Sequence, residues 1–463
     1  MLSSHPSGCV ISEKTRPRNS GSATETWHEC GTQHFRLAIV FLLVNTVSSL
    51  FFIHFVRRPV FDDSNYLRDV HRYATEGVSV DSIRRNITAP GPTSFVWMAA
   101  AVRALDGNEL RDARLACLTS WLAIGGIVLL GARYTHYPGP WYAALLFTLV
   151  LPHTLTATAT IRAEGPAMVF ALLGALAWTE SVSRSTITPR VVLLGLIGGL
   201  AMGLAIDGRQ YYLAMLAAAG IYAMCRWREL GFETKSLWLP NAITSLVAAC
   251  VTVLLLVSIW KGLSSPGMAA GTSYGTVFSK VGPNPFRPAL AIFYIMMYLF
   301  PFSFPAMFCP AFTRRWRAAV IAALGGIGAA LSASFLLQPG PLKTFIEFVG
   351  REPVGERLIL GLITAVAIYN AIGLGYLTRQ KWAAAKSCPP VVFAMLVLVF
   401  FIGEQFGVSG NLPFYEIYIL QIAPFLGLAV FAVLPKLTLP RVASLVFLSL
   451  ISQGLLWRHA FGA

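Results

Sequence analysis

The sequence predicts an all-α, polytopic transmembrane protein with about thirteen spans of roughly 20 residues each. Of its 463 residues, 56% are hydrophobic and only 12% are charged, whereas about 25% of the residues of a soluble domain are charged. Apolar runs recur along the chain and match a hydrocarbon core about 30 Å thick. Short polar segments rich in arginine separate these runs. These observations exclude a soluble globular domain.

The chain divides into a polar tail, residues 1–34, and a transmembrane domain, residues 35–463. The tail is rich in Ser and Thr and has no apolar core of a signal peptide, so we expect it to be disordered and cytoplasmic. The first predicted span covers about 35–56. The further spans are expected near 113–132, 139–158, 164–182, 190–206, 210–226, 239–260, 286–308, 316–337, 357–377, 388–405, 414–434 and 438–457.

Charge predicts the orientation of these spans. The formal net charge is +15, from 36 Lys and Arg against 21 Asp and Glu, and cytoplasmic loops of membrane proteins collect basic residues. With the N-terminus inside, alternate connections are basic and the acids gather on the external side. The lipid bilayer therefore explains the basic character. We expect no nucleic-acid partner, because aromatic–basic interleaving and zinc-finger spacing are both missing from the sequence.

The cysteines and histidines do not form a metal-binding pattern. The seven cysteines include no CxxC pair, and several lie within apolar spans, where Cys acts as a small hydrophobic residue. His136 and His153 have no second ligand at metal-binding spacing, so we expect structural roles for both. The sequence predicts neither a metal nor a cofactor.

The first external loop, residues 57–112, departs from the charge rule. Nine arginines between Arg57 and Arg114 face eight acidic residues, which predicts a structured, salt-bridged loop. Asp62 and Asp63 follow the first span at once. A Pro-Gly-Pro turn at 90–92 leads into the apolar stretch 95–102, which is too short to cross a bilayer and predicts an interfacial helix.

Two further polar clusters are expected on the same external face. Arg162 and Glu164 open the fourth predicted span, and Arg209 and Gln210 lie between the fifth and sixth. One carboxylate could take the proton from a hydroxyl acceptor, and arginines bind and stabilise a phosphate leaving group. Together these groups suit sugar transfer from a polyprenyl-phosphate donor. Which of the two aspartates is the base stays open.

The same residues carry a resemblance to a known family. An acidic pair behind the first span, an Arg-led entry to the second span at Arg114, and an acid after Arg162 resemble the GT-C superfamily of integral-membrane glycosyltransferases. The Gly208–Tyr212 segment is similar to a motif of its eukaryotic lipid-linked-oligosaccharide α-1,2-glucosyltransferases, without the Thr-Asn that completes it. The late 414–418 segment resembles a helix entry of bacterial protein-mannosyltransferase and aminoarabinose-transferase members. The chain departs from the usual pattern with Asp-Asp in place of Asp-Glu and with Glu at 164.

The resemblance implies a hexosyltransferase-type enzyme acting at the external face. Its donor would be a polyprenyl-phosphate sugar and its acceptor a hydroxyl of a glycan, lipid or protein. It also implies a bacterial inner membrane, or the endoplasmic reticulum membrane in a eukaryote.

The candidate site residues follow from these motifs. The candidate catalytic residues are Asp62 and Asp63, and the candidate substrate-binding residues are Arg162, Glu164, Arg209, Gln210, His71, Arg84 and Arg85.

Each candidate also has a plain structural interpretation. An Asp can cap a helix, Glu164 can favour a helix N-terminus, and an interfacial Arg can snorkel. Arg84 and Arg85 suit loop salt bridges, and His71 suits a loop surface.

Two other functions remain open. A transporter or flippase of a lipid-linked or anionic substrate would predict internal repeats and paired broken helices. A membrane scaffold would leave the clustered carboxylates without a role.

Overall fold

The chain is helical throughout the part that the structure describes. This computed structural model describes residues 20–60, 63–88, 90–184, 186–262, 265–266, 286–307, 316–332, 341–350, 352–407, 418–434 and 436–461. All regular secondary structure in these segments is helix. The predicted all-α class is confirmed there, and Asp62 lies outside the described residues.

The helices follow the predicted spans closely. The N-terminal half contains α1 (Ser20–Phe55), α2 (Asp63–Glu76), α3 (Val80–Arg84), α4 (Pro92–Leu105), α5 (Glu109–Gly126), the π-helical η1 (Ile127–Gly131), the 3-10 helix η2 (Ala132–Tyr134), α6 (Pro138–Val150), α7 (Thr154–Ala159) and α8 (Glu164–Ser183). The remainder contains α9 (Pro189–Gly208), the 3-10 helix η3 (Gln210–Tyr212), α10 (Leu213–Glu229), α11 (Phe232–Trp260), α14 (Phe286–Met307), α16 (Trp316–Leu331), α18 (Pro341–Gly350), α19 (Pro353–Ala385), α20 (Pro389–Gly407), α21 (Tyr418–Val433) and α22 (Leu439–Phe461).

Eight helices in the described part are long and apolar enough to cross a membrane, and three further apolar helices are shorter. The chain is therefore a multi-pass membrane protein by the length and composition of its helices. The count of thirteen spans stays a prediction. The expected span 139–158 is broken into α6 and α7 around Pro152, because proline cannot donate the backbone hydrogen bond that a continuous helix needs.

The N-terminal helix is longer than the predicted first span. Helix α1 begins at Ser20, so it includes part of the segment 1–34 that the sequence predicts to be a disordered tail. Its apolar part begins at Gly31. Residues 1–19 lie outside the description, and the location of the tail stays a prediction.

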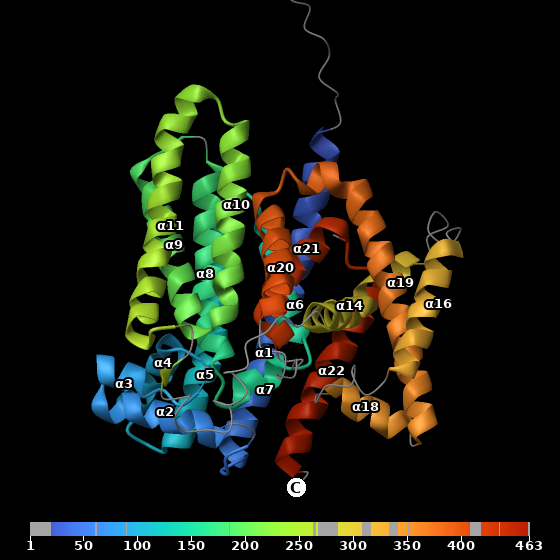
Figure 1. The fold of residues 1–463 in the computed structure, drawn as a ribbon, viewed down its shortest axis with the longest axis horizontal. Coiled ribbons are helices and arrows are strands. Elements are labelled where there is room, and N and C mark those ends of the chain that lie inside the picture. The colour runs from blue at the N-terminus through green and yellow to red at the C-terminus, as the bar shows by residue number, and fades with distance from the viewer. Residues whose placement is uncertain are drawn as a thin grey trace, which may run out of the picture.

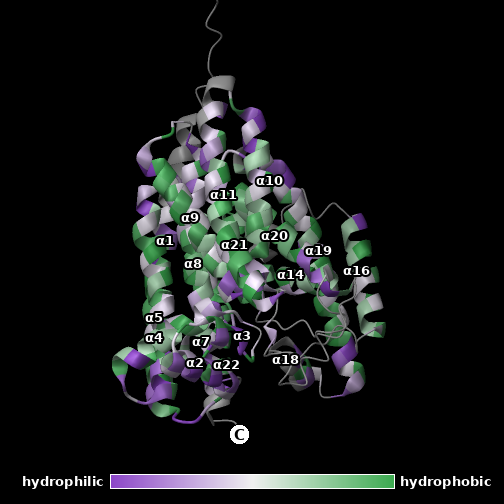
Figure 2. Ribbon diagram, turned by 60° about the vertical axis from the view of Figure 1, so that its left-hand side comes forward, coloured by the Kyte–Doolittle hydropathy of each residue, from purple (hydrophilic) through white to green (hydrophobic). Residues whose placement is uncertain are grey.

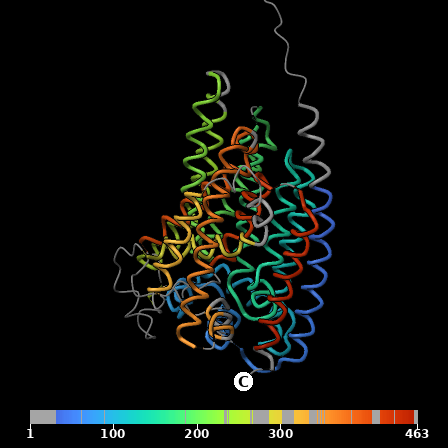
Figure 3. Tube along the Cα trace, turned by 90° about the vertical axis from the view of Figure 1, so that its right-hand side faces the viewer, coloured from blue at the N-terminus to red at the C-terminus, as the bar shows by residue number. Residues whose placement is uncertain are grey.

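The helices pack side by side, with α2, α3 and α4 gathered at one end of the α8–α11 group (Figure 1). Hydrophobic residues dominate the middle of the helices, whereas hydrophilic residues mark α2 and α3 (Figure 2). Helix α1 runs along one side of the molecule next to α22 (Figure 3). Helices α2–α4 occupy the stretch expected to be the first external loop; its membrane side stays a prediction. At 14 residues, α4 is about 21 Å long, which is short of a full crossing.

Small residues on α9 bring three helices into backbone contact. A Cβ added at Gly199 would lie 1.9 Å from the Ser245 carbonyl oxygen on α11, and one at Gly198 would lie 2.6 Å from the Trp178 backbone nitrogen on α8. Gly203, one turn further on, faces Thr252 of α11 equally closely. Transmembrane helices associate through such close approaches, since lipid offers no hydrophobic gain for their contact. This packing holds the end of α9 in place against α8.

Replacing Gly199 by Val is expected to separate α9 from α11 and to destabilise the protein by about 1–3 kcal/mol, the usual effect of overpacking. Thermal unfolding in detergent measures the effect. Gly220→Val on α10 is the matched control, because nothing lies within 4 Å of a Cβ there. Equal melting temperatures for the two variants would contradict this description of the α9–α11 contact.

Candidate functional site

A buried ion pair joins the start of α2 to α5. The Asp63 carboxylate and the Arg114 guanidinium are both nearly inaccessible, and Arg114 Nη2 lies 2.6 Å from Asp63 Oδ2. Arg114 Nε donates a second hydrogen bond of 3.1 Å to the same oxygen. Arg114 also donates to the backbone carbonyls of Val56 and Arg58, just beyond α1. One arginine therefore fixes the exit of α1 against α5.

Four hydrogen bonds hold the Asp63 carboxylate. Besides the two bonds from Arg114, Oδ2 accepts the Val60 backbone N–H at 3.1 Å, and Oδ1 accepts that of Ile161 at 2.7 Å. Three of the four bonds therefore fall on Oδ2 and one on Oδ1. They fix the position of Asp63 at the start of α2.

The turn before α8 links Asp63 to the second predicted cluster. The Ile161 backbone N–H donates a hydrogen bond to the Asp63 carboxylate. The Ala163 carbonyl accepts a hydrogen bond of 2.9 Å from the Ser94 hydroxyl. Arg162 places its guanidinium 6.0 Å from the centre of the Tyr66 ring. Because consecutive Cα atoms are 3.8 Å apart, Ile161 and Glu164 are at most about 11 Å apart. The first two predicted clusters therefore converge.

Glu164 forms a buried ion pair with Arg209. Glu164 begins α8 and is inaccessible, and Arg209 follows α9 with a side chain that is 7% exposed. Burial lowers the pKa of Arg209, but the Glu164 charge and the neighbouring tyrosines together raise it by more, so the guanidinium stays protonated. The third predicted cluster therefore joins the other two, and Gln210 lies beside it as the first residue of η3.

Several buried polar atoms around this pair have no hydrogen-bond partner within the described part of the chain. They are Glu164 Oε2, Arg209 Nε, Tyr212 Oη and Trp121 Nε1. Trp121 Nε1 would lie 3.0 Å from a Cβ added at Gly165, which places it beside Glu164. Burial and the Glu164 charge both raise the pKa of Tyr212, so its phenol stays neutral and can donate. Buried orphan groups cost about 1–3 kcal/mol each, so a site with both donors and acceptors favours a polar ligand or water.

Asp69, which the sequence interpretation missed, holds the segment just before the Pro-Gly-Pro turn. Its buried carboxylate accepts the backbone N–H groups of Ile87 and Thr88 and the Thr88 hydroxyl, at 3.1, 3.1 and 2.6 Å. Burial raises the pKa of Asp69, and these bonds together with Arg72 counteract the rise. Helical spacing from Asp63 through Tyr66 to Asp69 could have indicated a shared buried face.

The turn also contacts the end of α9. Gly91 donates its N–H to the Gly208 carbonyl at 3.1 Å, and a Cβ at Gly91 would lie 1.7 Å from the Asp207 carbonyl oxygen. Only glycine permits this approach. The turn therefore connects α2, through Asp69, to the helix end that carries Arg209.

Another buried arginine, which the sequence interpretation missed, adjoins the site. Arg287 on α14 is 1% exposed and donates to Gln405 Oε1 at 3.1 Å. Burial raises the pKa of Tyr211, and the charges of Arg287 and Arg209 both lower it, which places Tyr211 near both guanidinium groups. The Tyr211 and Tyr418 rings lie 5.0 Å apart. The sequence signal that could have identified Arg287 is its position as an isolated arginine at the end of a predicted span.

Three predicted substrate-binding residues lie apart from this site. His71 is 60% exposed and contacts Glu109 at 3.1 Å. Arg84 donates to the Ile259 carbonyl at the end of α11, and Arg85 forms an exposed ion pair with Glu76. These contacts are typical of a loop surface, which is the structural interpretation that the sequence also allowed for these three residues. Within the described residues, no group of three His, Cys, Asp or Glu side chains could hold a metal ion.

No protein-family model matches the sequence, and no curated protein matches it significantly. Solved structures show a distant similarity. ArnT from Cupriavidus metallidurans bound to undecaprenyl phosphate has a TM-score of 0.42 and 15% identity, covering 92% of this chain and 77% of that one. An Archaeoglobus fulgidus oligosaccharyltransferase in complex with Zn and sulfate has a TM-score of 0.30 and 14% identity, covering 80% and 53%. Similarities of this size define no family, so function is argued from the residues.

Replacing Asp63 by Asn is expected to destabilise the protein by about 3–5 kcal/mol, because it leaves Arg114 buried without its counter-charge. Thermal unfolding of the purified protein measures the loss. Glu109→Gln breaks the exposed contact with His71 and should cost less than about 1 kcal/mol. A melting temperature for Asp63→Asn as close to the wild type as that of Glu109→Gln would disprove the anchoring role.

Proposed function

We propose that this protein is an integral-membrane glycosyltransferase of the GT-C type. It would move a hexose from a polyprenyl-phosphate donor to a hydroxyl of a glycan, lipid or protein. The observation that carries the proposal is the buried Glu164–Arg209 pair at the end of the helices where α2–α4 gather. Around the pair are buried polar atoms that have no hydrogen-bond partner in the described part of the chain. The sequence motifs that resemble the superfamily supply these same residues.

The reaction needs a base, a cation that stabilises the leaving phosphate, and hydrogen-bonding groups that hold the sugar. Asp62 would take the proton from the acceptor hydroxyl as its oxygen attacks the anomeric carbon. The bond between that carbon and the phosphate oxygen breaks, and polyprenyl phosphate leaves with the electron pair. Arg209 and Arg162 would stabilise the departing phosphate, since guanidinium binds phosphate in a bidentate manner. Tyr212 and Trp121 would hydrogen-bond to the sugar hydroxyls.

The roles of the two aspartates differ in this proposal. The four hydrogen bonds on Asp63 make it a positioning residue that holds the start of α2. Its neighbour Asp62 is thereby the better base, because a base needs hydrogen-bond reach to the acceptor and a lone pair to receive the proton. Glu164 would orient Arg209 rather than take the proton, because it is inaccessible and ion-paired.

The cellular setting follows from the same proposal. The active face would lie outside the bacterial inner membrane, or in the endoplasmic reticulum lumen of a eukaryote. His71, Arg84 and Arg85 have no part in the reaction as proposed, because each serves a surface contact.

Asp62→Asn is expected to lower hexose transfer by at least about 100-fold, the usual contribution of a general base, with an unchanged melting temperature. Asp63→Asn should lower both activity and stability. Transfer of labelled hexose from undecaprenyl phosphate into membrane glycolipids and glycoproteins provides the measurement, with mannose and glucose donors tested in parallel.

The control is Asp81→Asn, which changes an exposed acid in the same loop. Full transfer by Asp62→Asn would refute its role as the base. Flux of the lipid-linked sugar in proteoliposomes, without any transfer product, would support a flippase instead.

Arg209→Gln is expected to weaken undecaprenyl phosphate binding by about 10-fold or more, since hydrogen bonds to charged groups contribute about 1.5–3 kcal/mol. It also leaves Glu164 buried and unpaired, which lowers stability. The double variant Arg209→Gln with Glu164→Gln removes both charges, so it should recover stability but not binding. Product inhibition by undecaprenyl phosphate reports the affinity, and recovery of binding in the double variant would count against a phosphate-binding Arg209.

A further inference from the structure

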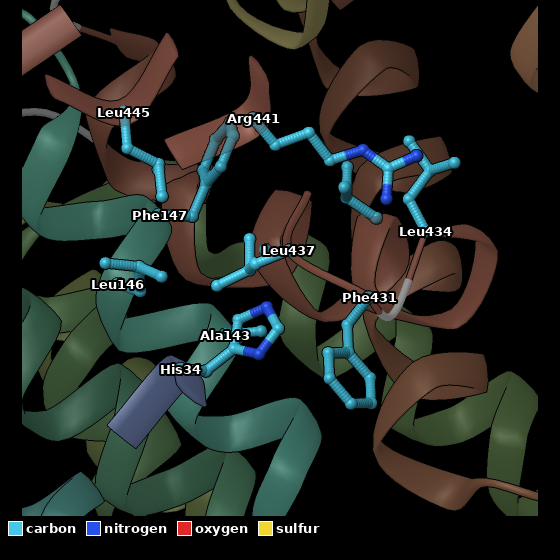
Figure 4. Close-up of a pocket in the computed structure, with 11 residues that line it drawn as sticks. His34, Ala143, Leu146, Phe147, Phe431, Leu434, Leu437, Arg441 and Leu445 are labelled. Atoms are coloured by element: carbon cyan, nitrogen blue, oxygen red, sulfur yellow. The ribbon is translucent and has the colours of Figure 1, made fainter. Parts of the chain in front are cut away.

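A pocket lies among α1, α6, α21 and α22, far from the site described above. Its empty volume is about 360 Å³, including the space open to its surroundings. Its lining residues are His34, Ala143, Leu146, Phe147, Gly427, Val430, Phe431, Leu434, Leu437, Arg441 and Leu445. Figure 4 shows the Arg441 side chain extending across one side of the pocket toward Leu434, with the His34 ring on another side.

This pocket is at the opposite end of the helices from the candidate active site. His34 precedes the end of α1 at Phe55 by 21 residues, and a helix rises 1.5 Å per residue, so about 30 Å separate the two ends. The chain leaves α1 at Phe55 toward Asp63 and α2. The pocket therefore lies near the membrane face that loop charge predicts to be cytoplasmic.

The lining combines an apolar interior with basic groups. Nine of its eleven residues are apolar, and the other two are His34 and Arg441. Helices α6 and α21 approach closely here, since a Cβ at Gly427 would lie 2.7 Å from the Ala144 Cα atom. The pocket thus has firm apolar walls with a cation at its edge, which matches an acyl chain below an anionic headgroup.

The parts of the four helices that line the pocket carry no acidic residue. Helices α6, α21 and α22 contain no Asp or Glu, and α1 contains none from His34 to its end. Near Arg441, Lys381 on α19 donates to the Val433 carbonyl at the end of α21, and Lys436 accepts a hydrogen bond from Arg441 through its own carbonyl. Basic pockets between transmembrane helices on the cytoplasmic side bind anionic lipid headgroups.

We propose that this pocket is a binding site for an anionic phospholipid of the cytoplasmic leaflet. Arg441, with Lys436 and Lys381 nearby, would bind the phosphate-containing headgroup. The apolar walls from Ala143 to Phe147 and from Gly427 to Leu434 would hold part of an acyl chain. The lipid would join α1 and α6 to α21 and α22 at the end opposite the candidate active site.

The test compares lipid binding to the intact, detergent-purified protein. Native mass spectrometry and thermal shift are measured with phosphatidylglycerol, phosphatidylcholine of the same acyl chains, and inorganic phosphate. Phosphatidylglycerol should bind more tightly and raise the melting temperature more than phosphatidylcholine. Arg441→Gln should weaken phosphatidylglycerol binding about fivefold, whereas Arg441→Lys retains it.

Two further variants distinguish the contribution of the headgroup to lipid binding from that of the acyl chain. Leu437→Trp fills the apolar part and should weaken both lipids, with Arg441 still in place. Arg228→Gln removes an exposed charge at the end of α10 outside the pocket and should change neither. Equal binding of the two lipids, unchanged phosphatidylglycerol binding in Arg441→Gln, or full competition by inorganic phosphate would each overturn the proposal.

Discussion

The buried ion pair between Asp63 and Arg114 joins parts of the chain that the rest of the site depends on. It connects the exit of α1, the start of α2, the N-terminal part of α5 and the turn before α8, through side-chain and backbone hydrogen bonds. In a low-dielectric interior neither charge is tolerated alone. The pair therefore forces these segments to meet, and Glu164 follows three residues after the Ile161 contact.

From that junction the geometry extends to α9. Asp69 holds the segment just before the Pro-Gly-Pro turn, and the turn itself contacts Gly208, which brings the Arg209 helix end to Glu164. The close packing of Gly198 and Gly199 against α8 and α11 supports the same placement. Hydrogen bonds and ion pairs therefore specify which segments meet. Small residues allow the backbones of those segments to approach closely.

The two ends of the helices differ in chemistry. At the α2–α4 end, acids and arginines pair inside the protein, and several buried polar atoms have no hydrogen-bond partner among the described residues. At the other end, the pocket beside His34 and Arg441 is apolar with basic groups and no acid on α6, α21 or α22. This contrast agrees with the predicted orientation, in which basic residues collect on the cytoplasmic side.

The sequence by itself determined the helical membrane class, most helix positions and the three polar clusters at Asp63, Glu164 and Arg209. It could do so because hydrophobic length and rare charges within apolar spans are local signals. Only the tertiary structure distinguished partners among the charges: Asp63 forms a buried ion pair with Arg114, whereas His71, Arg84 and Arg85 make surface contacts. Asp69 and Arg287 were missed for the same reason. Whether a charged side chain is buried, paired or exposed depends on residues distant in the chain, and spacing along the sequence does not record them.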